Sequence, residues 1–152
     1  MSEPAPTSDI HMVVGYDESE PANRALDAAV RLLQGRTGNG RLNVVYVAQI
    51  PSTAMFSAGA IGELENSFDE LEVELRDMVA KRLGSEQRWG FERRNGLISD
   101  ELIDVAQELT EAHPNDTVAI VVGSSSHATH RLIGSVPVHL ARHSPVPLFI
   151  VP

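Results

Sequence analysis

The chain contains five short apolar runs that are rich in valine and isoleucine, and these runs predict β-strands. The runs Met12–Val14 and Val118–Val122 are continuously apolar, which is typical of strands covered on both faces of a sheet. The five predicted strands are Ile10–Tyr16, Leu42–Ile50, a weaker Arg88–Arg94, Val118–Val122 and Val146–Val151.

Between these runs, apolar residues recur every three or four positions and predict four helices. They run from about Pro21 to Leu33, from Ile61 to Leu83, from Ser99 to just before Pro114, and from Ser135 to His143. Pro21 suits a first helical turn, and Ser99, followed by two acids, is typical of an N-cap. The acidic face of the second helix, from Glu63 to Glu74, is expected to be solvated surface.

Strands that alternate with helices predict an α/β fold, in which a parallel sheet carries helices on both faces. A length of 152 residues suits one domain of this kind. We expect that domain to span residues 9–152 and to follow a short disordered tail at residues 1–8.

Polar residues follow the first and fourth predicted strands, where ligands bind in sheets of this class. Asp17 ends the first strand. After the fourth come Gly123, Ser124, Ser125 and Ser126, and then Gly134-Ser135 opens the last helix. Unpaired N–H groups at a helix N-terminus, together with hydroxyls, form an anion pocket. A plain Gly-Ser turn and a serine-capped helix explain the same residues without a ligand.

Charge and composition narrow the functional classes. The formal net charge of −9 argues against a nucleic-acid surface. The absence of cysteine excludes thiol catalysis and a disulfide framework. No stretch approaches the roughly 18 apolar residues of a membrane span. The first residues resemble no secretory signal, so we expect a cytoplasmic protein with no membrane partner.

Two segments, VVGYDES in the first strand and GSSSHATHRLIGSVPVHLARHSPVPLFIV at the end, resemble the universal stress protein family. The resemblance extends from His11 to Pro152. It implies a Rossmann-like domain with a five-stranded parallel sheet in the order 3-2-1-4-5. It also implies a stress-response regulator that binds ATP or another adenine nucleotide, with Mg²⁺ as a companion of the phosphates.

The resemblance also implies which residues bind the nucleotide. They are Gly15, Tyr16, Asp17, Val47, Gly123, Ser124, Ser125, Ser126, Arg131, Gly134, Ser135 and Val136. Asp17 corresponds to the acid that holds the adenosine moiety, and Val47 to a strand-two position whose main chain meets the adenine edge. Helix capping by Asp17 and core packing by Val47 are the alternatives.

The phosphate loop departs from the family pattern of Gly, two residues, Gly, nine residues, Gly, Ser or Thr. Ser126 replaces the second glycine, and only seven residues separate it from Gly134. Two alternatives to nucleotide-dependent regulation therefore stay open. One is a nucleotide-free dimeric interaction module of the same fold, and the other is an enzyme with at most weak ATP hydrolysis.

The last strand is expected at a sheet edge, because Pro147 has no N–H to donate to a ladder. An apolar, uncharged edge favours pairing with another chain, and the family resemblance implies a homodimer through Val146–Val151. A short edge shielded by its own loops is the alternative.

Histidines suggest two further contacts. His139 and His143 are four residues apart on a predicted helix, but no third ligand has a suitable spacing, so surface histidines are expected. His127 and His130 lie in the loop, where protonated imidazoles can meet phosphate, although solvent exposure is the simpler interpretation.

Overall fold

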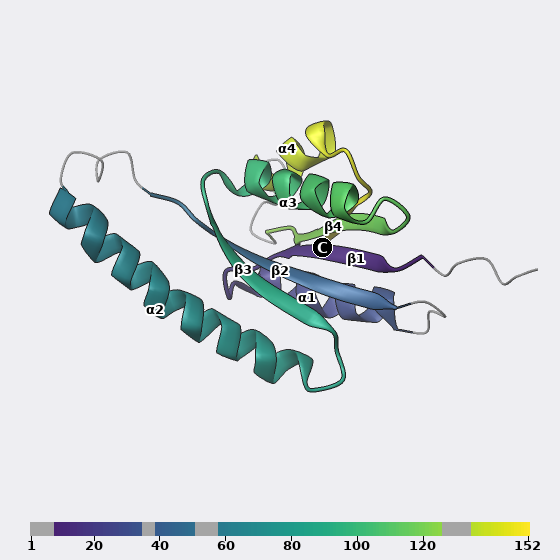
Figure 1. The fold of residues 1–152 in the computed structure, drawn as a ribbon, viewed down its shortest axis with the longest axis horizontal. Helices are drawn as coiled ribbons and strands as arrows, with labels where there is room; N and C mark the ends of the chain where they lie inside the picture. The colour runs from purple at the N-terminus through teal and green to yellow at the C-terminus, as the bar shows by residue number, and fades with distance from the viewer. Residues whose placement is uncertain (1–7, 35–38, 51–57, 126–134) are drawn as a thin grey trace, which may run out of the picture.

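The computed structural model describes residues 8–34, 39–50, 58–125 and 135–152. Strands and helices alternate along the whole chain (Figure 1). Their bounds are β1 Ile10–Gly15, α1 Glu20–Leu33, β2 Gly40–Ala48, α2 Ala58–Leu83, β3 Trp89–Asn95, α3 Ile98–Ala112, β4 Thr117–Gly123, α4 Ser135–His143 and β5 Leu148–Val151. The predicted α/β order is confirmed.

All strands are parallel and form one five-stranded sheet in the order β3-β2-β1-β4-β5. Strand β1 is central, and Val13 pairs with Asn43 of β2 on one side and Ile120 of β4 on the other. The chain thus adds strands on one side of β1 and then crosses to the other. This reversal between β1 and β4 is where such sheets bind ligands.

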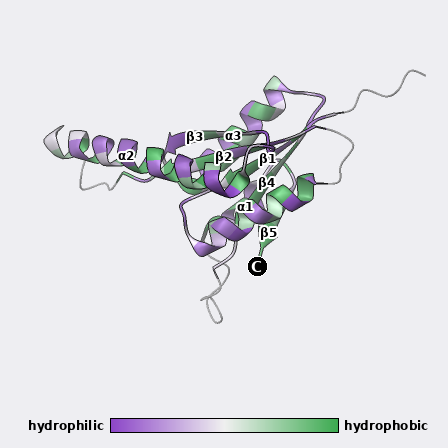
Figure 2. Ribbon diagram, turned by 90° about the horizontal axis from the view of Figure 1, so that it is seen from below, coloured by the Kyte–Doolittle hydropathy of each residue, from purple (hydrophilic) through white to green (hydrophobic). Residues whose placement is uncertain are grey.

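Alternation along the strands divides the core into two layers. Met12, Val14 and Tyr16 pack toward α1 and α2, whereas Val13 packs toward α3 and α4. Burying each of these side chains stabilises the fold by about 1.5–3 kcal/mol. Figure 2 shows the hydrophobic residues concentrated on the strands between the helices.

Helix α1 begins at a serine cap and lies close to the sheet. Ser19 Oγ accepts a hydrogen bond from the Ala22 N–H at 3.3 Å, and Pro21 occupies the first turn. A Cβ added to Gly123 of β4 would clash with the Pro21 carbonyl oxygen and lie 2.7 Å from Pro21 Cα. Only glycine at this position lets the first turn of α1 approach the end of β4.

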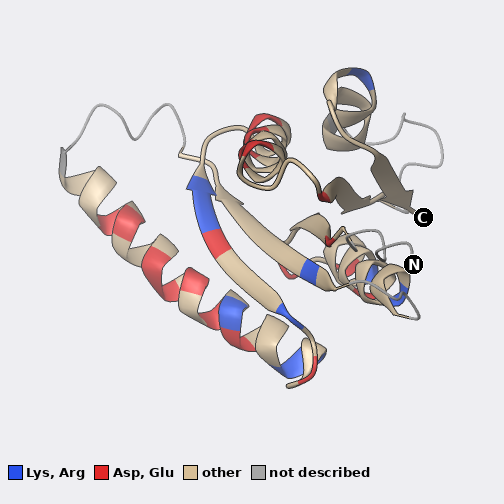
Figure 3. Ribbon diagram, turned by 45° about the vertical axis from the view of Figure 1, so that its right-hand side comes forward, with Lys and Arg blue, Asp and Glu red and all other residues tan. Residues whose placement is uncertain are grey.

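Helix α2 extends beyond the sheet and carries a row of acidic residues (Figures 1 and 3). Leu75 and Val79 anchor its second half in the core. Most of the acids are solvated, as predicted, but Asp69 lies 2.6 Å from Arg93 of β3. The two helices on this face are also tied together by Arg82 of α2, which donates two hydrogen bonds of 2.8 Å to Asp27 of α1.

Several predicted boundaries differ from the observed ones by up to three residues. Helix α3 begins at Ile98, not at a Ser99 cap, because the Glu101 N–H already bonds to the Leu97 carbonyl. Strand β2 ends at Ala48, two residues before the predicted Ile50. Strand β5 begins at Leu148, because Val146 is held in a turn by two hydrogen bonds with Ser144 Oγ.

Two other expectations concern the chain as a whole. Residues 1–7, most of the predicted tail, lie outside the described residues. None of the described helices combines the length and the apolar character needed to cross a membrane.

Gly123→Ala tests the contact between α1 and β4. The added methyl group must displace backbone atoms of Pro21, so we expect the free energy of unfolding to fall by about 1–3 kcal/mol in urea denaturation. Gly62→Ala is the matched control, because its Cβ meets no atom within 4 Å in helix α2, and it should increase stability by about 0.5–1 kcal/mol. Wild-type stability of Gly123→Ala would contradict this packing.

Candidate functional site

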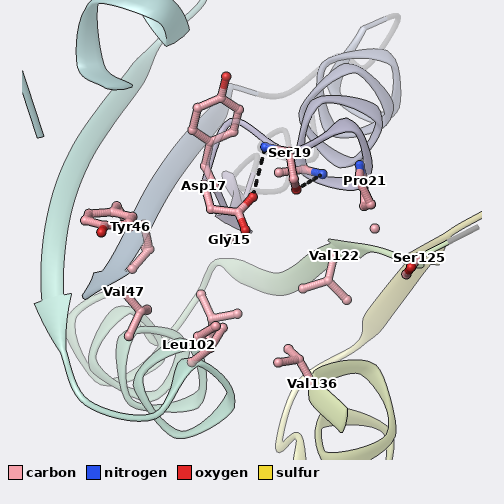
Figure 4. Close-up of a pocket in the computed structure, with 15 residues that line it drawn as sticks. Gly15, Asp17, Ser19, Pro21, Tyr46, Val47, Leu102, Val122, Ser125 and Val136 are labelled. Carbon is pink, nitrogen blue, oxygen red and sulfur yellow. Dashed lines mark hydrogen bonds between the residues drawn. The ribbon is translucent and has the colours of Figure 1, made fainter. Parts of the chain in front are cut away.

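A pocket opens at the carboxyl ends of β1, β2 and β4, at the reversal of strand order (Figure 4). Its volume of about 230 Å³ is somewhat below the range of about 300–1,000 Å³ that is usual for small-molecule sites. The apolar walls come from both the sheet and the helices above it. They are formed by Val45, Val47, Ile98, Leu102, Val122 and Val136.

The polar part of the pocket comes from the loop between β1 and α1. Asp17 Oδ1 accepts a hydrogen bond from the Ser19 N–H at 3.1 Å. Among the described residues, the other carboxylate oxygen of Asp17 has no hydrogen-bond partner. Asp17 is also the only charged side chain among the described residues that line the pocket. A hydroxyl-bearing ligand therefore meets one free, strong acceptor here.

Backbone strain and one asparagine shape this loop. Glu18 has φ of 62°, a left-handed conformation that costs a residue with a Cβ about 1–2 kcal/mol. Asn23 of α1 holds the loop at two points: its Oδ1 accepts from the Tyr16 hydroxyl at 2.9 Å, and its Nδ2 donates to the Glu18 carbonyl at 3.3 Å. The loop thus presents Asp17 in one fixed position.

Tyr16 does not offer its hydroxyl to the pocket, because that group is bonded to Asn23. Burial raises the pKa of Tyr16 above its ordinary value, so the phenol stays protonated at neutral pH. The part of Tyr16 free to meet a ligand is its main chain. The N-cap of α1 is Ser19, so Asp17 supports the cap residue and is not itself the cap.

Val47 presents main-chain groups as well as an apolar side chain. The Tyr16 N–H bonds to the Val45 carbonyl at 2.9 Å, so Val45 directs its main-chain groups toward β1. In a parallel strand, residues two apart direct these groups to the same side. Val47 therefore directs its N–H and C=O to the β1 side as well. The pairing of β1 with β2 ends at Gly15 and Val45, so these groups of Val47 lie beyond the paired part of β1 and face the pocket.

The residues after β4 are partly engaged within the protein. The Ser124 N–H bonds to the Val151 carbonyl at 2.8 Å, and the Ser124 carbonyl accepts from Arg24 Nη2 at 2.9 Å. The Ser124 N–H is therefore already paired within the protein and does not point to an anion. Ser125 lines the pocket and is the last described residue of this segment.

The two glycines of the site have packing roles. A Cβ on Gly15 would lie 3.2 Å from Leu102 Cδ1, so Gly15 lets helix α3 pack close to β1. The space beside Gly123 is filled by Pro21 and is not left open for a ligand.

The structure brings most of the predicted site residues together. Those that line the pocket are Gly15, Tyr16, Asp17, Val47, Gly123, Ser125 and Val136. Ser124 lies at its margin, and Ser135 is the first residue of α4. Ser126, Arg131 and Gly134 lie outside the described residues, as do His127 and His130.

Several site residues were not predicted. Ile98 and Leu102 come from the first turns of α3, and their apolar spacing indicates a buried face without showing that it faces a pocket. Asn23 is one turn into α1, and no pattern marks it as the residue that holds the loop. Val122 could have been found, because it directly precedes Gly123.

The predicted histidine pair on α4 has an unpredicted neighbour. The rings of His139 and His143 lie 4.4 Å apart between centroids, as helical spacing requires. Asp100 of α3 approaches His139 Nε2 to 3.2 Å, since α3 packs against α4. Asp100 is distant from this pair in sequence, so no spacing rule marks it as a neighbour.

Comparison with known proteins connects this geometry to a family. A universal stress protein from Lactobacillus plantarum is 21% identical with a TM-score of 0.71, over 98% of this chain and 100% of that one. A universal stress protein in complex with cAMP is 23% identical with a TM-score of 0.58, over 93% of this chain and 96% of that one. A universal stress protein family member from Arabidopsis thaliana with AMP bound is 15% identical with a TM-score of 0.59, over 96% of this chain and 91% of that one.

These structural likenesses show the shared fold. No curated protein matched the chain at the threshold applied. The family model of universal stress proteins matches residues 11–152, nearly the whole sequence. The chain therefore belongs to the universal stress protein family.

Proposed function

We propose that this protein binds an adenine nucleotide in the pocket at the ends of β1, β2 and β4, and that it acts as a regulatory protein in the stress response. The observation that carries the proposal is the carboxylate of Asp17, which lines an apolar pocket and has one oxygen without a hydrogen-bond partner among the described residues. Family members solved with cAMP and with AMP add support for this class of ligand.

The pocket suits each part of a nucleoside. The apolar walls, including Val45 and Leu102, suit the faces of a purine ring. The main-chain groups of Val47 suit the hydrogen-bonding edge of that ring. Asp17 suits the ribose hydroxyls, since a carboxylate accepts hydrogen bonds strongly. Ser125 and the start of α4 then lie on the side where a phosphate would emerge.

The proposal also concerns how many phosphate groups the bound nucleotide carries. The described residues lining the pocket include no cationic side chain, and Ser124 has already used its N–H. ATP would depend on Arg131, Gly134 and Ser135, with Mg²⁺ held mainly by the phosphates themselves. AMP or a cyclic nucleotide has one phosphate and needs fewer contacts from the segment between β4 and α4. We therefore propose that the monophosphate binds at least as tightly as ATP.

A nucleotide-free dimeric interaction module is the second candidate, and one observation favours it. Strand β5 lies at the sheet edge, where Phe149 and Ile150 are 39% and 37% exposed. An apolar edge of this kind favours pairing with a second chain. We propose a homodimer through this strand under either function, in the cytoplasm.

Asp17→Asn tests nucleotide binding. Replacing the carboxylate by an amide removes charged hydrogen bonds worth about 1.5–3 kcal/mol, so we expect AMP affinity to fall about 10- to 100-fold in calorimetric titration of nucleotide-stripped protein. Asp104→Asn, an exposed acid on α3, is the matched control and should bind AMP like the wild type.

Parallel titrations with ATP, ADP and cyclic AMP rank the affinities of nucleotides that differ in their phosphate groups. No heat from any of the four ligands, with no nucleotide retained through purification, would reject nucleotide binding and leave the interaction module.

Ile150→Lys tests the dimer. A lysine on the β5 edge should block strand pairing, so the wild type should sediment at twice the 16.5 kDa chain mass and the variant as a monomer. Val73→Lys is the control, because Val73 is 68% exposed on α2, away from β5, and its variant should stay dimeric. A monomeric wild type would refute the dimer.

A further inference from the structure

A cluster of His11, His113 and Asp116 lies at the amino ends of β1 and β4, at the opposite end of the sheet from the pocket. His11 is the second residue of β1, and Asp116 immediately precedes β4. His113 follows the last residue of α3. Three elements therefore deliver one side chain each to the same place.

The ligand-type atoms of the cluster are close together. His11 Nε2 lies 2.9 Å from Asp116 Oδ2, and His113 Nδ1 lies 3.8 Å from the same oxygen. One ligand atom from each of the three residues lies within 4.8 Å of the others. The two imidazole rings stack with centroids 4.7 Å apart and an interplanar angle of 22°.

The backbone around Asp116 fixes the direction of its carboxylate. The Asp116 N–H bonds to the His113 carbonyl at 3.0 Å, closing a tight turn that contains Pro114. The Asp9 N–H donates to Asp116 Oδ1 at 3.1 Å. One carboxylate oxygen is thus held by the main chain, and the other is turned toward both imidazoles.

His11 is costly as a purely structural residue. It is 5% exposed, and within the described ranges it is the only buried polar or charged residue. Its Nδ1 is buried and has no hydrogen-bond partner among the described residues. Nδ1 is the ring nitrogen farther from the cluster, since Nε2 is the one that faces Asp116. A buried imidazole with one unpaired nitrogen destabilises a fold relative to an apolar side chain, which indicates that Nε2 has a use at this position.

We propose that His11, His113 and Asp116 form a zinc site that uses two imidazole nitrogens and one carboxylate oxygen, with water as the fourth ligand. This combination of ligands suits Zn²⁺, and three protein ligands with an open position are a common arrangement. The hydrogen bond from Asp9 supplies the outer support that metal-binding carboxylates usually have.

A turn of the His113 side chain would bring the cluster to the geometry that zinc needs. Zinc–ligand bonds of about 2.0–2.1 Å in a tetrahedron place neighbouring ligand atoms about 3.3 Å apart. This separation lies between the distances from Asp116 Oδ2 to His11 Nε2 and to His113 Nδ1, which are 2.9 Å and 3.8 Å. The His113 side chain is 47% exposed, so it can turn out of the ring stack, and it leaves a path for the ion from solvent. Zinc here would tie the start of β1 to the turn between α3 and β4.

The test uses full-length protein in which the other four of the six histidines, His127, His130, His139 and His143, are changed to Gln. Calorimetric titration with ZnCl₂ should then show one ion per chain. Co²⁺ in its place should give the intense visible absorption of a tetrahedral site. Zinc should also raise the melting temperature of this protein.

In the same background, His113→Ala and Asp116→Ala should each weaken zinc binding more than about 100-fold, because each removes a direct ligand. Both residues are at the surface turn, and circular dichroism checks that the variants fold. Glu111→Gln, an exposed acid two residues before His113, is the matched control and should bind zinc unchanged.

Absence of zinc uptake would overturn the proposal and leave a His11–Asp116 hydrogen bond. Zinc binding that survives in both His113→Ala and Asp116→Ala would also overturn it. Nucleotide binding is measured separately at the other end of the sheet, so failure of either proposal is distinguishable from failure of the other.

Discussion

The close approach of Pro21 to Gly123 is the constraint on which the candidate site depends. The first turn of α1 occupies the space that a side chain on β4 would need. Because of this contact, the β1–α1 loop and the end of β4 lie beside each other across the strand-order reversal. Arg24, one turn further along α1, reinforces the arrangement by donating to the carbonyls of Ser124 and Pro152.

This packing explains how a small α/β domain builds a polar site at the edge of an apolar core. Among the lining residues that the structure describes, those of the sheet and of helices α3 and α4 are uncharged, and the loop before α1 provides the one carboxylate. The left-handed backbone at Glu18 turns the loop, and the two hydrogen bonds of Asn23 hold the loop in place, so that the carboxylate lies at the pocket. Such fixed positioning lowers the ordering cost of binding a ligand.

Periodicity alone predicts the alternation of strands and helices, because continuous apolar runs and helical spacing are strong signals. It does not predict the strand order, since no local pattern shows which strands are neighbours; that order followed from the family resemblance. The ends of elements depend on single hydrogen bonds, such as that from Glu101 to Leu97, which propensity does not show. Among site residues, Asp17 and Val47 were predicted through the family pattern.

Long-range contacts account for what the sequence could not show. The role of Gly123 depends on Pro21, about a hundred positions earlier in the chain, and the position of Asp17 depends on Asn23. The cluster of His11 and Asp116 joins residues 105 positions apart, so no spacing rule could have found it.

The central claim is that the ends of β1, β2 and β4 form one nucleotide site. Amide chemical-shift changes measured by NMR during AMP addition test it most directly. The account predicts saturable changes concentrated at Gly15, Asp17, Val47, Gly123 and Ser125, with the amides of His11 and Asp116 unaffected. Saturable changes confined to other surfaces, or none at all, would contradict it.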